Sequence, residues 1–274
     1  MVWFEGDSDH DSFLNVGVPA IGFGNEPDRF IHSNLDDLWG IDRTQLGRNA
    51  ASAALIAYTM ASADTSAFDL IAGEVVGRGE ARLARNLGLA LQLIAASSNK
   101  AGAYHAAVDQ MQYAAARERR ALRSLGEIAA GAPARVAPLL ATLDRREADD
   151  ARDLAAAYLR SARAPAQGAI PSRVLSPAER ELASLRPVIV GTPADFYVHR
   201  DQIGAGETVN GYLAQEMLNA IDGTRTGLDI YRHAAAMIRE AGAQYYGSVD
   251  PQSVLTLLRS AEQSKLYRLD PVTR

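Results

Sequence analysis

The residues best suited to chemistry lie among the first forty positions. A Ser8-Asp9-His10 segment is followed by Phe13, and a second histidine and carboxylate pair, His32 and Asp36, follows further along the chain. Imidazole and carboxylate groups are ligands that zinc accepts, and a two-metal hydrolase needs both types to converge on one pocket. The first chemistry to consider is therefore metal-dependent hydrolysis.

A serine-hydrolase site is a second interpretation of the same segment, because Ser8, Asp9 and His10 are the three residue types of a catalytic triad. A triad needs a nucleophile, a base and an orienting group that converge from separate elements of the fold. Adjacent residues cannot adopt that arrangement, so this interpretation is rejected.

Three short motifs occur in a fixed order: Ser8-Asp9-His10-x-x-Phe13, then Gly17-Val18-Pro19-Ala20, then His32-Ser33-x-x-Asp36. Together they resemble the closing third of the di-zinc aminopeptidase domain of peptidase family M28. The resemblance runs from about residue 3 to residue 61, under a quarter of the chain. It implies that His32 is the last zinc ligand, that Asp36 orients the ligand loop, and that Asp9 and His10 line the pocket.

The same resemblance implies an activity for the parent protein. Two zinc ions would bind there, and a peptide or protein substrate would be cleaved at its free N-terminus by a zinc-activated water, with a glutamate as general base. The parent would be secreted or periplasmic. No signal peptide is expected in this chain, whose first residues are acidic and glycine-containing rather than basic and then apolar.

Most of the ligands implied by the family pattern have no counterpart in this sequence. They would come from a His-x-Asp strand end, an aspartate loop, a Glu-Glu pair and a later aspartate, all before the matched motifs. No Glu-Glu pair occurs, and His199-Arg200-Asp201 follows the last ligand instead of preceding it. We therefore expect a C-terminal portion of a zinc metallopeptidase that binds no zinc stably and is inactive alone. His105 and His233 are expected to be packed or surface histidines rather than ligands.

The elements around these motifs predict an incomplete α/β domain over residues 1–62. Two short apolar runs, 2–4 and 18–23, are typical of buried parallel strands, and Thr44 is a plausible N-cap for a helix that ends near Ser62. Two strands and one helix cannot make a doubly wound domain. The uncovered apolar residues therefore predict either a homo-oligomer or cover by the rest of the chain.

The remaining sequence predicts a fold that is α+β but mostly α. Residues 66–163 show three amphipathic patterns, with breaks at 99–102 and 131–133, which indicate an antiparallel helical bundle. The mixed charges of 144–150 are expected to form a solvated face. A linker over 164–172 leads to a small winged-helix-like α+β module at 173–274, with Ser176 as a helix cap, a strand at 188–190 and helices at 207–221, 226–241 and 251–263.

Composition limits the function classes. The chain has no cysteine, which excludes disulfides and thiolate metal sites, and no apolar run is long enough to span a membrane. Residues 1–62 carry nine acidic residues against three arginines, which suits a cation-binding region. Residues 165–274 carry twelve acidic against eleven basic residues, so no nucleic-acid partner is expected.

Two other functions compete with a peptidase. One is a non-catalytic interaction or dimerisation module, with Tyr245, Tyr246 and Tyr267 as core or interface aromatics. The other is a DNA-binding regulator that would use helix 226–241 for recognition, which the charge of the module disfavours.

Overall fold

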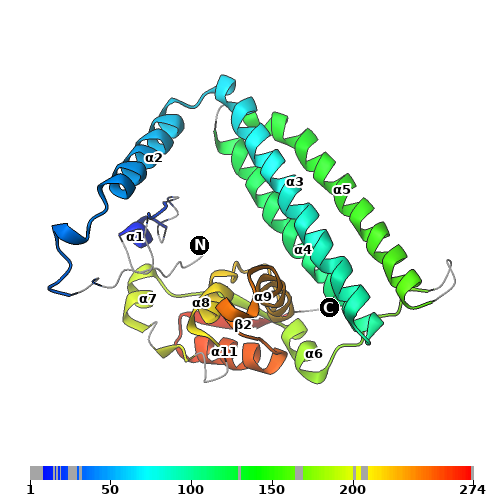
Figure 1. The fold of residues 1–274 in the computed structure, drawn as a ribbon. Helices are drawn as coiled ribbons and strands as arrows, with labels where there is room; N and C mark the ends of the chain where they lie inside the picture. The colour runs from blue at the N-terminus through cyan, green and yellow to red at the C-terminus, as the bar shows by residue number, and fades with distance from the viewer. Residues whose placement is uncertain are drawn as a thin grey trace.

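The computed structural model describes residues 9–14, 16, 18, 20–23, 30, 33–128, 131–163, 169–199, 202–204 and 209–272. Most of the described residues are helical, and two strands form one small antiparallel sheet. Three parts follow one another along the chain: an N-terminal segment, three long helices that lie side by side, and a smaller α+β module (Figure 1).

The long helices form the bundle that the sequence predicts. They are α3 (Thr65–Ala96), α4 (Lys100–Ser124) and α5 (Ala132–Ser161), and a short 3-10 helix η2 (Leu125–Glu127) extends α4. Asp64 caps α3 and Asn99 caps α4 through side-chain oxygens that accept backbone N–H bonds. Gly131 precedes α5 with a φ of 82°, a left-handed conformation that glycine adopts without strain.

The core of the bundle is built from the apolar stripes of its helices. Phe68, Leu83, Ile94, Leu122 and Leu154 are all buried there, as the spacing of the leucines predicts. Polar side chains also lie inside: Asn86, Gln110, Glu118 and Asp150 are each at most 3% exposed. The expectation of a fully solvated face over 144–150 is wrong at Asp150, which is buried because Arg146 on the preceding turn pairs with it at 3.0 Å.

The C-terminal module begins at α6 (Pro177–Ser184), whose start is a capping box between Ser176 and Glu179, as expected. Strand β1 (Leu185–Ile189) pairs antiparallel with β2 (Tyr267–Pro271), so that Pro187 lies opposite Leu269. Between the strands lie α7 (Pro193–His199), α8 (Gly211–Asn219), α9 (Gly227–Ala241), α10 (Ala243–Tyr246) and α11 (Pro251–Gln263).

The module has its own core, formed mainly by α8, α9 and α11, with Leu213, Met217, Ile230, Leu257 and Leu258 fully buried. Strand β1 starts three residues earlier than the predicted strand at 188–190, and α11 has the predicted bounds. Tyr267 is a core aromatic, whereas Tyr245 is exposed. The winged-helix resemblance of this module stays a prediction.

The N-terminal segment contains α1 (His10–Leu14), the 3-10 helix η1 (Leu38–Gly40) and α2 (Arg43–Ser62). Helix α2 has the expected extent, but Asp42 caps it instead of Thr44, since its carboxylate accepts the N–H bonds of Thr44 and Gln45. None of the residues of α2 is buried, and the helix lies apart from the bundle (Figure 1).

The predicted parallel strands are not seen where the structure can test them. Residues 18 and 20–23 adopt no regular structure, and the run 2–4 lies outside the described residues. A strand exists only when its backbone groups pair with a neighbouring strand, and the described part of the segment supplies none. Of the described helices, none combines the length and apolar character needed to cross a membrane.

Candidate functional site

The first group of predicted site residues lies at α1. His10 opens this helix, and its imidazole rests against Gly22, where an added Cβ would lie 3.5 Å from the ring atoms Cε1 and Nδ1. The structure thus brings His10 of the motif beside Gly22 of the apolar run. Asp9, directly before the helix, is exposed to solvent.

The second group lies in the turn before η1. The Ser33 hydroxyl donates to the carbonyl of Phe30 at 2.6 Å, and the backbone N–H of Asp36 donates to the carbonyl of Ser33 at 3.2 Å. Phe30 also meets Trp39 edge to face, with ring centroids 4.8 Å apart. These contacts hold the backbone of Asp36 at the end of a tight turn, and Asp36 is exposed there.

His32, the predicted zinc ligand, lies outside the described residues. Among the residues that are described, no group of three or more His, Asp or Glu side chains could hold a metal ion. The assignment of His32 as a zinc ligand therefore stays a prediction.

His105 and His233 are both packed, in agreement with the sequence. His233 on α9 meets the ring of Tyr113 on α4 at 4.8 Å, and burial lowers the pKa of its imidazole to about 4. His105 on α4 lines a cavity, where burial and then the charge of Arg173 lower its pKa. Both imidazoles are therefore neutral at pH 7.

A polar interface between the bundle and the C-terminal module was missed by sequence reasoning. Arg173 donates two hydrogen bonds to the carboxylate of Asp109, at 2.7 and 2.8 Å. Arg239 donates from Nε to Oε1 of Gln110 at 2.8 Å, and Gln110 in turn donates to Oδ1 of Asn86 at 2.7 Å. The one available signal was the presence of Asn86 and Gln110 beside the apolar stripes of their helices.

This interface bears on the DNA-binding alternative. Arg232 and Arg239 lie on the helix proposed for recognition, and both are directed toward α4, where they contact Asp109 and Gln110. Arg225, at the start of the same helix, donates to the carbonyl of Ala220 and pairs with Asp222. Because these arginine side chains are directed into the chain, the helix does not present them as a row to the phosphates of a DNA duplex.

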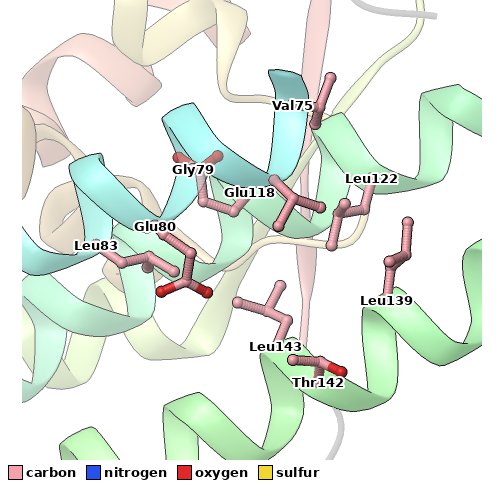
Figure 2. Close-up of a pocket in the computed structure, with 10 residues that line it drawn as sticks. Val75, Gly79, Glu80, Leu83, Glu118, Leu122, Leu139, Thr142 and Leu143 are labelled. Atoms are coloured by element: carbon pink, nitrogen blue, oxygen red, sulfur yellow. The ribbon is translucent and has the colours of Figure 1, made fainter. Parts of the chain in front are cut away.

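An apolar cavity of about 70 Å³ lies inside the bundle, between α3, α4 and α5. Figure 2 shows Leu83, Leu122, Leu139 and Leu143 around it, with the carboxylate of Glu118 at its edge. Glu118 is held there by Arg82, which donates from Nε and Nη2 at 2.8 and 2.7 Å. A water molecule takes up about 30 Å³ in the liquid, so this cavity has little more than the volume of a few water molecules. It is smaller than a typical ligand site.

Comparison with known proteins gives one match. The family model for Peptidase family M28 matches residues 2–57, the part of the chain that contains His32, Asp9, His10 and Asp36. No curated protein and no solved structure matches the chain. The match indicates that the N-terminal segment is peptidase-related, and it does not extend to the bundle or the C-terminal module.

Proposed function

We propose that residues 2–57 are the closing part of a zinc-dependent M28 peptidase domain, and that the complete domain is an aminopeptidase. The proposal rests on the family match over these residues, together with three motifs that occur within them in the order of the family pattern. In that domain His32 would bind zinc, and peptides or proteins with a free N-terminus would be the substrates.

In the complete domain, we infer that Asp9, His10 and Asp36 would lie on one wall of the pocket. His10 lies against Gly22, and Asp36 is held by the turn that begins at Phe30. In open α/β sheets, ligands bind where loops leave the ends of the strands, and both motifs belong to loops of this kind in the proposed domain. Asp9 and His10 would line the substrate side of the pocket.

The chain alone is proposed to lack turnover, because one imidazole offers one of the roughly four ligands that a stable zinc site needs. The test uses hydrolysis of amino-acid p-nitroanilides with added zinc, together with the zinc content after dialysis. Two proteins are compared: this chain, and a longer version that includes any coding region in frame before it.

The His32→Ala variant is made in both proteins, with His199→Ala in α7 as the matched control. We expect activity only in the longer protein, lost in His32→Ala and kept in His199→Ala. Turnover by this chain that disappears in His32→Ala would overturn the claim of inactivity. Full activity of the longer His32→Ala protein would overturn the ligand assignment.

A second role, as an interaction module, is favoured by one observation. Helix α2 buries none of its residues, and three apolar side chains on one stripe of the helix, Leu46, Ile56 and Met60, are each more than 40% exposed. Apolar side chains gathered on an uncovered helix are typical of a surface that binds another chain. Light scattering over a range of concentrations tests this role independently of any peptidase activity.

A further inference from the structure

A cavity of about 380 Å³ lies where the bundle meets the C-terminal module. Its walls come from the first three turns of α4, from the loop before α6, and from α9. A volume of this size falls within the range of small-molecule sites. It is separate from the N-terminal segment that matches the peptidase family.

The charged groups around this cavity are mostly cationic. Three arginines line it, Arg173, Arg232 and Arg239, against two carboxylates, Asp109 and Glu179. The carboxylate of Glu179 accepts a hydrogen bond from the backbone N–H of Ser176, so it is engaged in the cap of α6. His105 adds no charge at pH 7. The lining therefore carries an excess of one positive charge.

Arg232 has unused hydrogen-bonding capacity. Its Nε lies 3.8 Å from Oδ1 of Asp109, too far for a hydrogen bond, and this buried atom has no hydrogen-bond partner among the described residues. Asp109 is already taken by Arg173, which donates to both of its oxygens. A buried donor without a partner is costly, and an acceptor bound in the cavity would remove that cost.

The start of α4 adds to the positive potential. Asn99, Ala101 and Gly102, the N-cap and first turn of this 25-residue helix, line the same cavity. The N-terminus of a helix carries roughly half a positive elementary charge and presents backbone N–H groups that favour anions. The helix terminus, the unpaired guanidinium nitrogen of Arg232 and the excess of arginines all favour a negatively charged ligand.

We propose that this cavity binds a small oxyanion, the group shared by carboxylates and phosphates, between Arg232, Arg239 and the N-terminus of α4. Arginine is suited to the task, because its planar fork of donors matches the oxygens of either group. The ligand would bridge α4 and α9, and so would fasten the C-terminal module to the bundle. This inference does not depend on the proposed peptidase function.

The test is calorimetric titration of the full chain with inorganic phosphate and, separately, with acetate, at constant ionic strength set by sodium chloride. We expect saturable binding of at least one anion, accompanied by a rise in Tm. The anion that binds more tightly identifies phosphate or carboxylate as the ligand group. No saturable binding of either anion would overturn the proposal.

The key variant is Arg232→Gln, expected to weaken binding at least tenfold, since a hydrogen bond to a charged group typically contributes that much. Arg268→Gln, at an exposed arginine of β2, is the matched control and should bind like the wild type. If Arg232→Gln does not fold, Ala235→Glu serves instead, because it places a carboxylate on the cavity wall and should abolish binding. Unchanged affinity in whichever of these variants folds would contradict the site.

Discussion

Arg117 on α4 and Glu240 on α9 are joined by an ion pair in which one guanidinium nitrogen, Nη1, lies 3.0 Å from each carboxylate oxygen. The side chain of Glu240 is 14% exposed, and that of Arg117 is 30% exposed. The same carboxylate accepts a hydrogen bond from Nδ2 of Asn86 on α3 at 3.2 Å. One carboxylate of the C-terminal module therefore contacts two helices of the bundle.

Removal of this carboxylate should destabilise the protein. Glu240→Ala removes the acceptor of Arg117 Nη1 and one of the two acceptors of Asn86 Nδ2, which keeps the carbonyl of Arg82. We expect the free energy of unfolding to fall by about 2 kcal/mol, less than the 3–5 kcal/mol of a fully buried pair. Urea unfolding of the wild type, both single variants and Arg117→Ala/Glu240→Ala gives the coupling energy. The exposed Arg78–Glu74 pair is the control, with an expected coupling below about 0.5 kcal/mol. Strict additivity at Arg117 and Glu240 would contradict the interpretation.

Two glycines of α3 should respond in opposite directions to alanine. A Cβ at Gly79 would lie 2.9 Å from Oε2 of Glu118, which Arg82 holds in place, whereas nothing lies within 4 Å of a Cβ at Gly77. We expect Gly79→Ala to destabilise the bundle by about 1–2 kcal/mol, because the buried ion pair must shift. Gly77→Ala should stabilise it by up to about 1 kcal/mol through helix propensity. Thermal unfolding of both variants checks this, and shifts of the same sign would refute it.

The bundle and several helix ends could be predicted from the sequence because they depend on local signals. Ser176 and Glu179 form the expected capping box, and Pro251 starts α11 directly after the capping residue Asp250. Such signals act within one turn of helix, and the apolar spacing of α3–α5 shows which face of each helix is buried. The type and extent of the bundle helices and of α11 follow from these features, whereas α8 is shorter than the helix predicted at 207–221.

The polar interface could not be predicted in the same way. Gln110 contacts Asn86 across 24 positions of sequence, and Glu240 contacts Asn86 across 154. Periodicity shows that a face is buried but does not identify the face it meets, so the partners of these side chains appear only in three dimensions. The composition of the apolar run 18–23 favours a strand, but residues 18 and 20–23 adopt no regular structure. A β-strand needs a neighbouring strand to pair with, and composition alone does not show whether one is present.

Stability should depend on pH through His233. Burial, with Arg225 and Arg120 adding to it, lowers the pKa of this imidazole to about 4, against about 6.5 in an unfolded chain. Between these values the unfolded state binds more protons, so stability rises with pH. The contribution of neutral His233 is complete above pH 6.5 and is lost as the pH falls toward 4, a difference of about 3 kcal/mol.

The measurement compares wild type with His233→Phe, which keeps a ring against Tyr113 but cannot titrate. Urea unfolding at pH 7.5 and at pH 4.5 gives the change in the free energy of unfolding for each protein. We expect the wild type to lose about 2–3 kcal/mol more than the variant between these two conditions. Parallel losses in the two proteins would show that His233 titrates normally.

Helix α2 should exchange its amide protons faster than the bundle. Its twenty residues bury none of their side chains, whereas most of the stability of a helix in a protein comes from the packing of its apolar face. In a monomer we therefore expect exchange of Arg43–Ser62 to be at least a hundredfold faster than exchange around Ala90 and Ile94, which are buried in the bundle. Hydrogen exchange read by mass spectrometry at low protein concentration measures both regions at once.

The concentration dependence of this exchange separates the two ways in which α2 could be covered. If α2 binds a second copy through Ile56 and Met60, its exchange should slow as the protein concentration rises, and Ile56→Lys should restore fast exchange. Arg48→Lys, elsewhere on the same helix, is the matched control, because it changes neither charge nor apolar surface. Slow exchange of α2 at every concentration in the wild type would mean that the helix packs within its own chain, and the self-association argument would then fail.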